Sequence, residues 1–439
     1  MLSPRAIEGA KCDAIWRLRR NLKYASFGVT RTIPPSATIE RAQPAMWKIG
    51  VTRIAEVTQL DRTGIPNFVS VRPRDLGPGI SYYNGKGVTK DAAKAGAMME
   101  AIERYSGERC DLPITFCTFD QILKWGPAID PVELLVPEVQ KYTPDLKLEW
   151  VQGFDLLTRK ATYLPLNAVV CPYEPAPGRA LFYASTNGLA SGNTLVEALC
   201  HALCEVIERD ALAISLASLE LAPAVNYVLK AIGIDPFGEM RRPSQFPLVG
   251  LDDLPRRAAI LVRKLRAANL QIFLRDITST AGIPTLDCTV IEGRNVHGGC
   301  GTHPDARVAL TRALTEAAQS RVACIQGGRE DLPEIIRPQT AFDPNDIYGR
   351  GEVRPFSLIR SYQHAGIDDD VSFLLNRLEK AGFSQVVAFD LTRQEIGIPV
   401  VRVVIPKAEA WTVFHLHTER GVFGPRVSHV LRNALAMKN

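Results

Sequence analysis

The hydrophobic and polar positions of this chain repeat one helical pattern in three separate segments. In each segment a glutamate is followed three residues later by a second polar residue, and alanines precede that glutamate by three and by seven positions. These offsets place all four residues on one face of a helix. The three sets are Ala93, Ala97, Glu100 and Glu103; Ala198, Ala202, Glu205 and Glu208; and Ala309, Ala313, Glu316 and Gln319.

Each predicted helix also has an apolar side. It is formed by Met98 and Ile102, by Leu203 and Ile207, and by Leu314 and Ala318. One pair of glutamates three residues apart is usually a solvated surface, but a solvated stripe does not need alanine at fixed positions. Small side chains let a ligand or another helix approach closely. We therefore expect three helices of one design whose polar stripes share a site.

A second recurrent pattern is an aspartate, a polar turn, a proline and then a strand. It occurs four times and predicts four hairpins, whose second strands are residues 67–71, 166–170, 285–291 and 400–405. The first three hairpins precede the three glutamate helices, so the chain repeats a hairpin, a glycine-bearing loop and a helix. This order predicts an α+β fold with mainly antiparallel sheet, rather than a doubly wound parallel sheet.

Three further helices are predicted from weaker signals. Residues 1–25 are expected to be helical, Thr38 is expected to cap a helix over 39–50 that ends at Gly50, and residues 369–382 are expected to form another.

The expected loops before the glutamate helices are rich in glycine, at residues 84–87, 186–193 and 298–301. Such a loop can bind phosphate, although a plain turn is the commoner case. Lys86 stands between two glycines and is a candidate for reaching a phosphate. His303 precedes the third helix and is equally consistent with a ligand contact or a structural hydrogen bond.

The composition is that of an ordinary globular protein. The 439 residues are 46% hydrophobic and 23% charged, which suits one large composite domain or about two to three domains. The net charge is +5, and the positive residues are scattered except for a cluster of Arg17, Arg19, Arg20 and Lys23. This cluster favours a solvated helix face over a nucleic-acid patch, so no nucleic-acid partner is expected, and a basic tail that docks an acidic partner is the alternative. A signal peptide and an apolar run of about eighteen residues are both missing, which predicts a cytoplasmic protein without membrane spans.

The nine cysteines include no Cys-x-x-Cys pair, as expected for reduced thiols. Cys200, His201 and Cys204 share one predicted helix and would either bind a soft metal or pack in its core. Helix packing is the commoner role of such cysteines.

Convergence of the three stripes would bring five carboxylates and one amide together. Like charges at that distance raise one another's pKa values or push the helices apart, so a cation is required. Oxygen ligands suit Mg²⁺ better than zinc, and Mg²⁺ often shares its ligands with phosphates. The predicted metal ligands are Glu100, Glu103, Glu205, Glu208 and Glu316. The predicted phosphate-binding cations, about one turn further on, are Arg104, Arg209 and Arg321.

The chain resembles the YcaO family in three motifs. NGKGVTKDAAKAGAMMEAIER, STNGLASGNTLVEALCHALCEVIERDA and GTHPDARVALTRALTEAAQSR are similar to the nucleotide-binding motifs of that family, and the resemblance extends from about Arg31 to the strand ending at Ile405. It implies an α+β YcaO-type fold with ATP and Mg²⁺ as cofactors. The family phosphorylates a peptide backbone carbonyl oxygen, a nucleophile attacks that carbon, and phosphate leaves. Cys, Ser or Thr nucleophiles give azolines, whereas an external sulfur gives a thioamide.

The resemblance also implies roles by position. The five glutamates would hold Mg²⁺, and nucleotide contacts would come from Arg31, Thr38, Thr186, Asn187, Arg209, Gln319 and Arg321. Gly96 stands where the family typically has Ser. We expect an N-terminal helical segment (1–60), a nucleotide-binding catalytic domain (61–405) and a C-terminal tail (406–439).

Three further sequence segments are similar to those of the subgroup that makes thioamides with a TfuA-type partner. They are STNGLASGNT, ERDA and DLTRQEIGIPVVRVVIP. That subgroup usually has Pro-Gly-Leu-Glu after the last strand, where this chain has Pro406, Lys407, Ala408 and Glu409. The ending LRNALAMKN lacks the proline-rich tail that resembles a catalytic element of azoline-forming members, which leaves the catalytic base unassigned.

The partners implied by this subgroup are a TfuA-like protein, a sulfur donor and a peptide or protein substrate, with a homodimer expected by analogy. In a methane-producing host the substrate would be a glycine of methyl-coenzyme M reductase, and otherwise a small precursor peptide. An azoline-forming cyclodehydratase and a non-catalytic ATP-binding scaffold are the alternatives.

Overall fold

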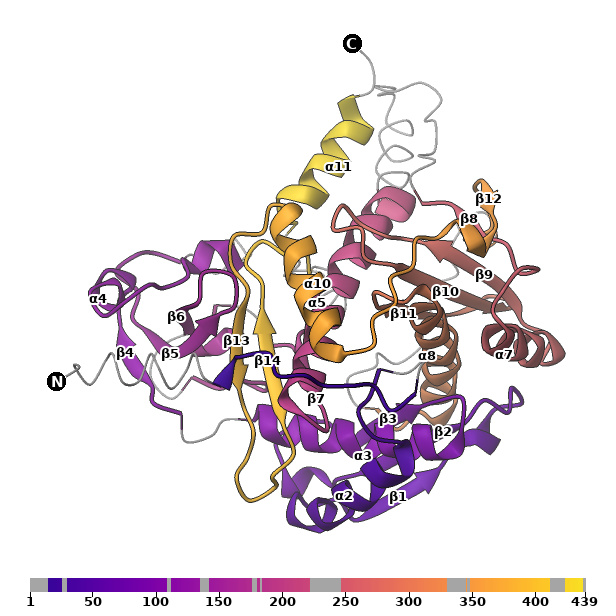
Figure 1. Cartoon of the computed structure of the whole chain (residues 1–439), viewed down its shortest axis with the longest axis horizontal. Helices are drawn as coiled ribbons and strands as arrows, with labels where there is room; N and C mark the ends of the chain where they lie inside the picture. Colours follow the sequence, from indigo (N-terminus) through magenta and orange to yellow (C-terminus); the bar gives the residue numbers. More distant parts are fainter. Residues whose placement is uncertain are drawn as a thin grey trace.

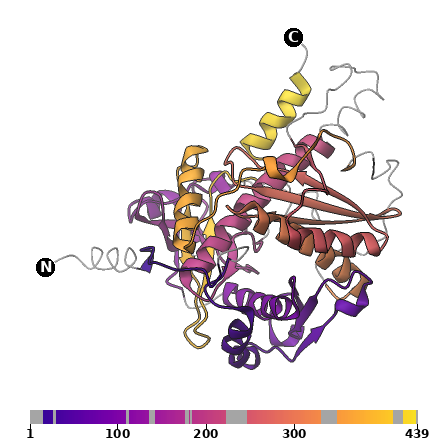
Figure 2. The same ribbon diagram turned by 45° about the vertical axis from the view of Figure 1, so that its right-hand side comes forward.

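Three sheets surround the three glutamate helices in the computed structural model of this chain (Figures 1 and 2). The structure describes residues 15–25, 30–108, 112–134, 142–175, 180–181, 184–221, 246–329, 345, 348–410 and 423–436. In Figure 1 helix α5 runs through the middle, with the six-stranded sheet to its left and the five-stranded sheet to its right. The three-stranded sheet and α3 lie below.

The first sheet comprises β1 (Arg53–Glu56), β2 (Asn67–Val71) and β3 (Tyr82–Lys86). The second has the order β11-β10-β9-β8-β12. Its strands are β8 (Leu248–Val249), β9 (Gln271–Asp276), β10 (Thr285–Glu292), β11 (Asn295–Thr302) and β12 (Val353–Arg354). The third has the order β4-β5-β13-β14-β7, with β6 paired to β5. Its strands are β4 (Thr115–Cys117), β5 (Leu148–Asp155), β6 (Lys160–Pro165), β7 (Leu189–Ser191), β13 (Val387–Asp390) and β14 (Val400–Val404).

The predicted α+β class is confirmed. Among the described strands every pair is antiparallel except the short pair β8–β12. The predicted strands 67–71, 285–291 and 400–405 correspond to β2, β10 and β14. The prediction for 166–170 is wrong, because β6 ends at Pro165 and the amides of Val169 and Val170 both donate to the carbonyl of Leu166. The chain turns there, since proline cannot donate a hydrogen bond that would continue a ladder.

The three predicted glutamate helices are confirmed as α3 (Lys90–Gly107), α5 (Leu195–Leu216) and α8 (Ala306–Gln326). Each begins after a side-chain cap that accepts a backbone N–H, from Thr89, Thr194 and Asp305. The six apolar residues assigned to their core side are all buried. Figure 2 shows α8 and α7 (Arg256–Ala267) along one face of the five-stranded sheet, where they form one apolar cluster with β9 and β10.

The glycine-rich segments before α3 and α8 are strands rather than the predicted loops. A Cβ atom on Gly85 of β3 would lie 2.1 Å from the carbonyl oxygen of Ala93 and 2.1 Å from the nitrogen of Ala97. Gly301 of β11 is as close to Ala309. The alanine stripes therefore pack directly on glycine-bearing strand backbone, which fixes each polar stripe next to its own strand.

The other helices are α2 (Pro35–Lys48), α4 (Phe119–Leu123), α10 (Ile367–Lys380) and α11 (Pro425–Ala436). Helix α10 confirms the helix predicted at 369–382. Helix α2 starts at Pro35 rather than after Thr38, because proline suits the first turn of a helix. Gly50, with φ +81°, follows its end. In the part of the chain that the structure describes, no helix is long and apolar enough to cross a bilayer.

The helix predicted for residues 1–25 is wrong for its described part. Residues 17–25 are not helical, and Leu22 forms a bridge with Gly366 just before α10. Tertiary contacts to α10 replace the local hydrogen bonds that a helix would have made. Residues 1–14 of this prediction lie outside the described residues.

Candidate active site

A cavity of about 540 Å³ lies where α3, α5 and α8 meet, and it receives the polar stripes of all three helices. Twelve of the predicted site residues line it: Arg31, Thr38, Lys86, Glu100, Glu103, Arg104, Thr186, Glu205, Glu208, Arg209, Glu316 and Gln319. The three segments are distant in sequence, so the fold brings together what periodicity predicted only as three similar faces.

Contacts between the repeats hold this arrangement. Lys86 of β3 forms an ion pair with Glu316 of α8, and the Gln319 side-chain amide donates to the carbonyl of Asn84 at 2.6 Å. The backbone amide of Ser191, at the end of β7, donates to Glu103 Oε2 at 3.0 Å. The first repeat is thus hydrogen-bonded to both of the others at the edge of the cavity.

The surroundings of three cavity carboxylates, Glu103, Glu205 and Glu208, disfavour their charged forms. Burial, reinforced by Glu205 and Glu100, raises the pKa of Glu103 well above its ordinary value. Burial also raises the pKa of Glu205 to about 7. Burial and the neighbouring Glu316 raise the pKa of Glu208. Several acids are therefore held in a site that disfavours their charged forms.

Glu316 behaves differently from the other acids. Burial opposes its ionisation, but the cations of Lys86 and Arg209 outweigh burial and hold the pKa of Glu316 below its ordinary value. Glu316 is therefore ionised, with Lys86 as its direct partner.

Arginines supply the positive side of the cavity. Burial alone would lower the pKa of Arg209, but Glu316 and Glu208 raise it above its ordinary value. The same balance of burial against Glu208 and Glu316 raises the pKa of Arg312. Both guanidinium groups therefore stay charged and suit phosphate oxygens.

The donor set fits a hard divalent cation. Glu208 Oε2 is buried and, among the described residues, has no hydrogen-bond partner. An ion bound by several carboxylate oxygens would pair with that atom and offset the burial and the repulsion that raise the pKa values of Glu103 and Glu205. Mg²⁺ fits better than zinc, since oxygen atoms are the donors that the five glutamates offer.

Arg321 and Asn187 do not line the cavity. Arg321 lies one residue beyond the position that matches Arg104 and Arg209, which turns it by about 100° around the helix. Its guanidinium binds Asp61 at 2.9 Å and Glu292 at 2.7 Å, and Ser320 takes the matching position at the cavity. The side-chain oxygen of Asn187 is buried and has no hydrogen-bond partner within the described part of the chain.

Sequence reasoning did not place His201 or Arg312 at this cavity, although it considered His201 together with Cys200 and Cys204 as a soft-metal ligand. Four residues before the first glutamate of each repeat stand Gly96, His201 and Arg312, and all three line the cavity. The signal was present, because a residue four positions earlier lies on the same helical face. Arg312 Nη1 lies 3.1 Å from His201 Nε2, and burial followed by Arg312 lowers the pKa of His201 well below its ordinary value.

Glu197 was also missed. It lies in the first turn of α5 and is buried, and its carboxylate accepts hydrogen bonds from the amide of Asn193 at 3.1 Å and the amide of Thr32 at 3.0 Å. Arg31 pairs with it at 3.3 Å. Asn193 in turn donates to the hydroxyl of Thr38 at 3.1 Å. This carboxylate therefore binds the N-terminal segment to the cavity wall.

The comparisons with known proteins agree with this geometry. The family model described as YcaO cyclodehydratase, ATP- and Mg²⁺-binding, matches residues 84–409. A protein of Methanothermobacter thermautotrophicus is 36% identical over 87% of this chain and 96% of its own length. A Rhizobium leguminosarum bv. trifolii protein in the tfuA 3′ region is 31% identical over 89% of this chain and 92% of its own length. The structure of YcaO from Methanopyrus kandleri bound with AMPPCP and Mg²⁺ has a TM-score of 0.68 at 25% identity, covering 90% of this chain and 96% of that one.

Proposed function

Because this chain belongs to the YcaO family, we propose that it uses MgATP to phosphorylate a backbone amide of a protein or ribosomally made peptide, so that sulfur can replace the amide oxygen. The observation that carries the proposal is the convergence of three polar stripes on one cavity. A scaffold that only sensed a nucleotide would not need three carboxylates, those of Glu103, Glu205 and Glu208, in surroundings that raise their pKa values.

The residues of the cavity divide into metal ligands and phosphate-binding groups. Bound Mg²⁺ would neutralise charge on phosphate oxygens and so favour phosphoryl transfer. Its candidate ligands are Glu100, Glu103, Glu205, Glu208 and Glu316. Arg209 and Arg312 are fixed cations beside these acids and would bind and orient the phosphates. Lys86 holds Glu316 ionised and would lie beside the same phosphates.

The proposed reaction balances as two displacements. The amide oxygen attacks the γ-phosphorus, and the bond between that phosphorus and ADP breaks. Sulfide then attacks the amide carbon, the carbon–oxygen bond breaks, and phosphate leaves with the former amide oxygen. Activation by phosphate is required because an amide oxygen is otherwise a very poor leaving group.

Two observations favour a thioamide over an azoline. The amino-acid sequence at 185–194 and 390–406 is similar to that of the TfuA-associated subgroup. A relative that is 31% identical lies in a tfuA 3′ region. We therefore propose a TfuA-like protein as the partner and a sulfide-level sulfur donor as the second substrate.

The test follows the amide oxygen. A candidate peptide labelled with ¹⁸O at its backbone amides is incubated with the chain, ATP, Mg²⁺, sulfide and the TfuA-like partner. The expected result is ¹⁸O in inorganic phosphate and a peptide whose intact mass rises by the difference between sulfur and oxygen. Loss of one water would indicate azoline formation instead. Unlabelled phosphate with an unchanged peptide, across the peptides encoded beside this gene, would contradict amide activation.

A further inference from the structure

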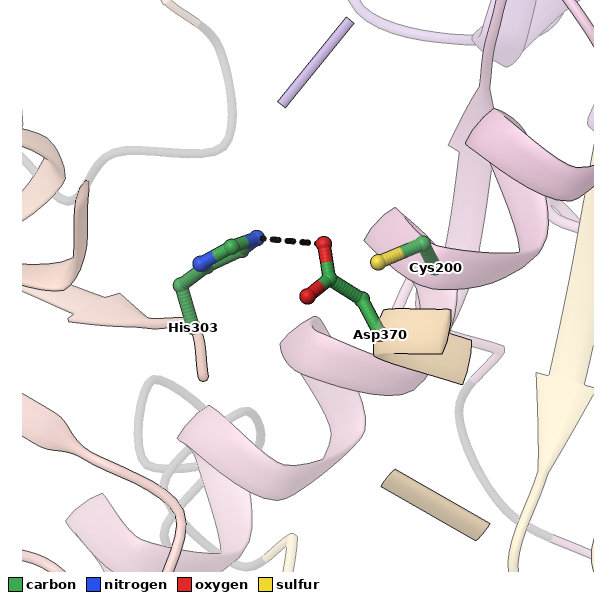
Figure 3. A group of neighbouring side chains, drawn as sticks. All are labelled: Cys200, His303 and Asp370. Atoms are coloured by element: carbon green, nitrogen blue, oxygen red, sulfur yellow. Dashed lines mark ion pairs between the residues drawn. The ribbon is translucent and has the colours of Figure 1, made fainter. Parts of the chain in front are cut away.

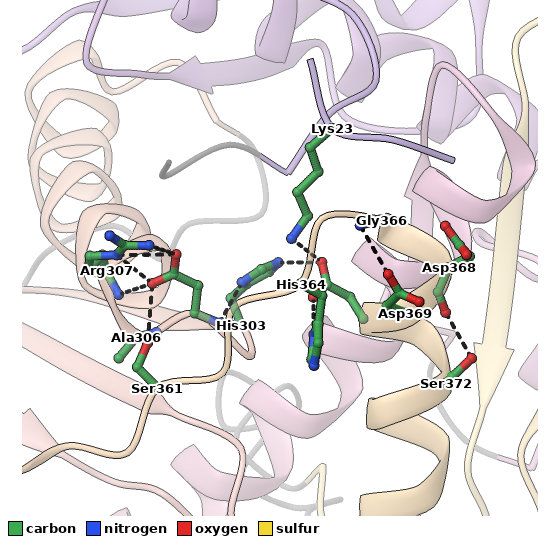
Figure 4. A network of polar contacts seen from close by, with 12 residues as sticks. Lys23, His303, Ala306, Arg307, Ser361, His364, Gly366, Asp368, Asp369 and Ser372 are labelled. Carbon is green, nitrogen blue, oxygen red and sulfur yellow. Dashed lines mark hydrogen bonds and ion pairs between the residues drawn. The ribbon is translucent and has the colours of Figure 1, made fainter. Parts of the chain in front are cut away.

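The N-terminal segment 15–25 is bound to α10 through several polar contacts, of which Figure 4 shows the one made by Lys23. Arg20 Nη1 pairs with Asp369 at 2.7 Å and with Asp368 at 3.2 Å. The Asn21 amide donates to Asp368 Oδ1 at 2.8 Å, and its carbonyl accepts the amide of Ile367 at 2.8 Å. The acidic residues in the first turn of α10 thus bind this segment. Negative charge is favourable at a helix N-terminus, and here it also pairs with the cation of Arg20.

Lys23 makes the deepest of these contacts. Its amino group lies 2.5 Å from Asp370 Oδ2, and the two side chains are 9% and 0% exposed. His364 Nδ1 approaches the other oxygen of Asp370 at 2.8 Å. Burial raises the pKa of Asp370, and Lys23 is the first group that opposes this rise. Removing the lysine would leave a buried carboxylate without its main counter-charge.

Asp370 also lies near Cys200 and His303, with ligand atoms within 4.8 Å of one another (Figure 3). A metal could bind this trio only by displacing protons from it. His303 Nδ1 accepts the amide of Asp305 at 2.9 Å, so the ring proton is on Nε2, the nitrogen that faces Asp370 at 3.6 Å. A hydrogen bond with Cys204, followed by burial, raises the pKa of the Cys200 thiol well above its ordinary value. The cation that serves Asp370 is therefore Lys23.

A short series of hydrogen bonds and ion pairs connects Lys23 to the cavity. The next residue, Tyr24, donates its amide to the carbonyl of Arg31 at 3.0 Å. Arg31 then pairs with Glu197, and the amide and hydroxyl of Thr32 both donate to Glu197 Oε2 at 3.0 Å. Arg31 and Glu197 both line the cavity. Lys23 is thus bound to Asp370, and Arg31 and Thr32 are bound to Glu197. The hydrogen bond between Tyr24 and Arg31 joins these two points of attachment.

We propose that Lys23 and Asp370 are positioning residues, which hold Arg31 and Thr32 against Glu197 at the edge of the nucleotide cavity. This inference rests on the proposed function only for the identity of the ligand in that cavity. Lys23 acts through the backbone of Tyr24 and Arg31 and does not touch the ligand. Its loss should weaken nucleotide binding by making Arg31 less well placed.

A double-mutant cycle tests the coupling. Affinity for AMPPCP in the presence of Mg²⁺ is measured by calorimetry for the whole chain with Lys23→Met, Arg31→Ala and both. We expect each single substitution to weaken binding about tenfold, and Arg31→Ala to have little further effect once Lys23 is gone. Effects that add, or an unchanged affinity in Lys23→Met, would overturn the inference.

Two further variants guard against misfolding. Arg20→Ala removes only the ion pairs of an exposed arginine with the first turn of α10. It is expected to weaken AMPPCP binding less than Lys23→Met does, but in the same direction. Lys90→Met is the matched control, because it breaks an exposed ion pair with Glu56 on another part of the chain. Wild-type affinity for AMPPCP in both Arg20→Ala and Lys90→Met would count against a role of the contacts between segment 15–25 and α10 in nucleotide binding.

A second measurement does not depend on the nucleotide. Amide hydrogen exchange at Thr32 should quicken in Lys23→Met and stay at its wild-type rate in Lys90→Met. Wild-type protein that failed to bind AMPPCP would overturn the proposed function, and the exchange result would still decide the positioning role. Equal Thr32 protection in all three proteins would show that Lys23 does not position this segment.

Discussion

Lys86 of β3 forms an ion pair with Glu316 of α8, although the two residues are 230 positions apart. The pair joins the first repeat to the third at the cavity. It also helps explain why the pKa of Glu316 is lowered while those of Glu103, Glu205 and Glu208 are raised: Lys86 pairs directly with Glu316, whereas for Glu208 it opposes the rise only as the last of several cations. The cavity therefore combines two carboxylates that pair with cations, Glu316 with Lys86 and Glu100 with Arg104, with three whose charged forms are disfavoured.

Replacing Lys86 by methionine is expected to raise the KM for ATP about tenfold, since it removes a cation that also keeps Glu316 ionised. Steady-state ATP consumption over a range of Mg²⁺ concentrations measures the effect. Lys86→Arg retains the charge and should recover most of the lost affinity. Equal KM values for the methionine variant and the wild type would contradict the role given to this lysine.

Glu208→Gln is expected to lower ATP turnover by about a hundredfold or more, because it removes an oxygen of a proposed Mg²⁺ ligand from a site whose proposed chemistry depends on neutralised phosphate charge. Thermal stability without Mg²⁺ should stay the same or rise, since one of several mutually repelling buried acids becomes neutral. Phosphate release and the melting temperature are measured together. Glu379→Gln, on the exposed side of α10, is the control and should change neither.

Neighbouring glycines on β11 provide a stability test of strand-on-helix packing. A Cβ atom on Gly299 would lie 2.1 Å from the nitrogen of Ala317 and 2.5 Å from the carbonyl oxygen of Ala313. We expect Gly299→Ala to lower the free energy of unfolding by about 2–3 kcal/mol. Gly298→Ala meets nothing within 4 Å and should change it by less than about 0.5 kcal/mol.

Urea unfolding of the two glycine variants in parallel gives the comparison, with the wild type as reference. Similar stabilities of the two variants would mean that the alanine stripes do not press on the strand backbone as closely as the structure indicates.

Asp287 of β10 should make stability depend on pH. Burial raises its pKa to about 7, although a hydrogen bond from Thr289 opposes the shift. Between about pH 4 and pH 7 the folded protein therefore holds a proton that the unfolded chain has released. This contribution to stability is lost as the pH rises through that window.

Asp287→Asn removes this titration, so the stability of the variant relative to the wild type should improve between pH 5 and pH 8. Denaturant unfolding of both proteins at the two pH values measures the change. A constant difference between variant and wild type across the window would show that the Asp287 carboxyl titrates normally.

The sequence by itself determined the three glutamate helices and the acidic character of the site. Helical periodicity is a local property, so the faces carrying Glu100, Glu205 and Glu316 could be assigned from spacing alone. Alternation and turn residues likewise predicted the strands at 67–71 and 285–291 and the α+β class.

Tertiary structure alone decided which residues those faces meet. Arg321 points away from the cavity because a shift of one position turns a side chain by about 100°, and its partners Asp61 and Glu292 lie elsewhere in the sequence. Gly85 proved to be part of a strand because it pairs with Phe68 of β2, and the close approach of the α3 backbone requires glycine there. Lys23 does not lie in the predicted helix, because it binds a buried carboxylate on α10. In each case a contact between distant residues outweighed a local preference, and such contacts have no signature in spacing.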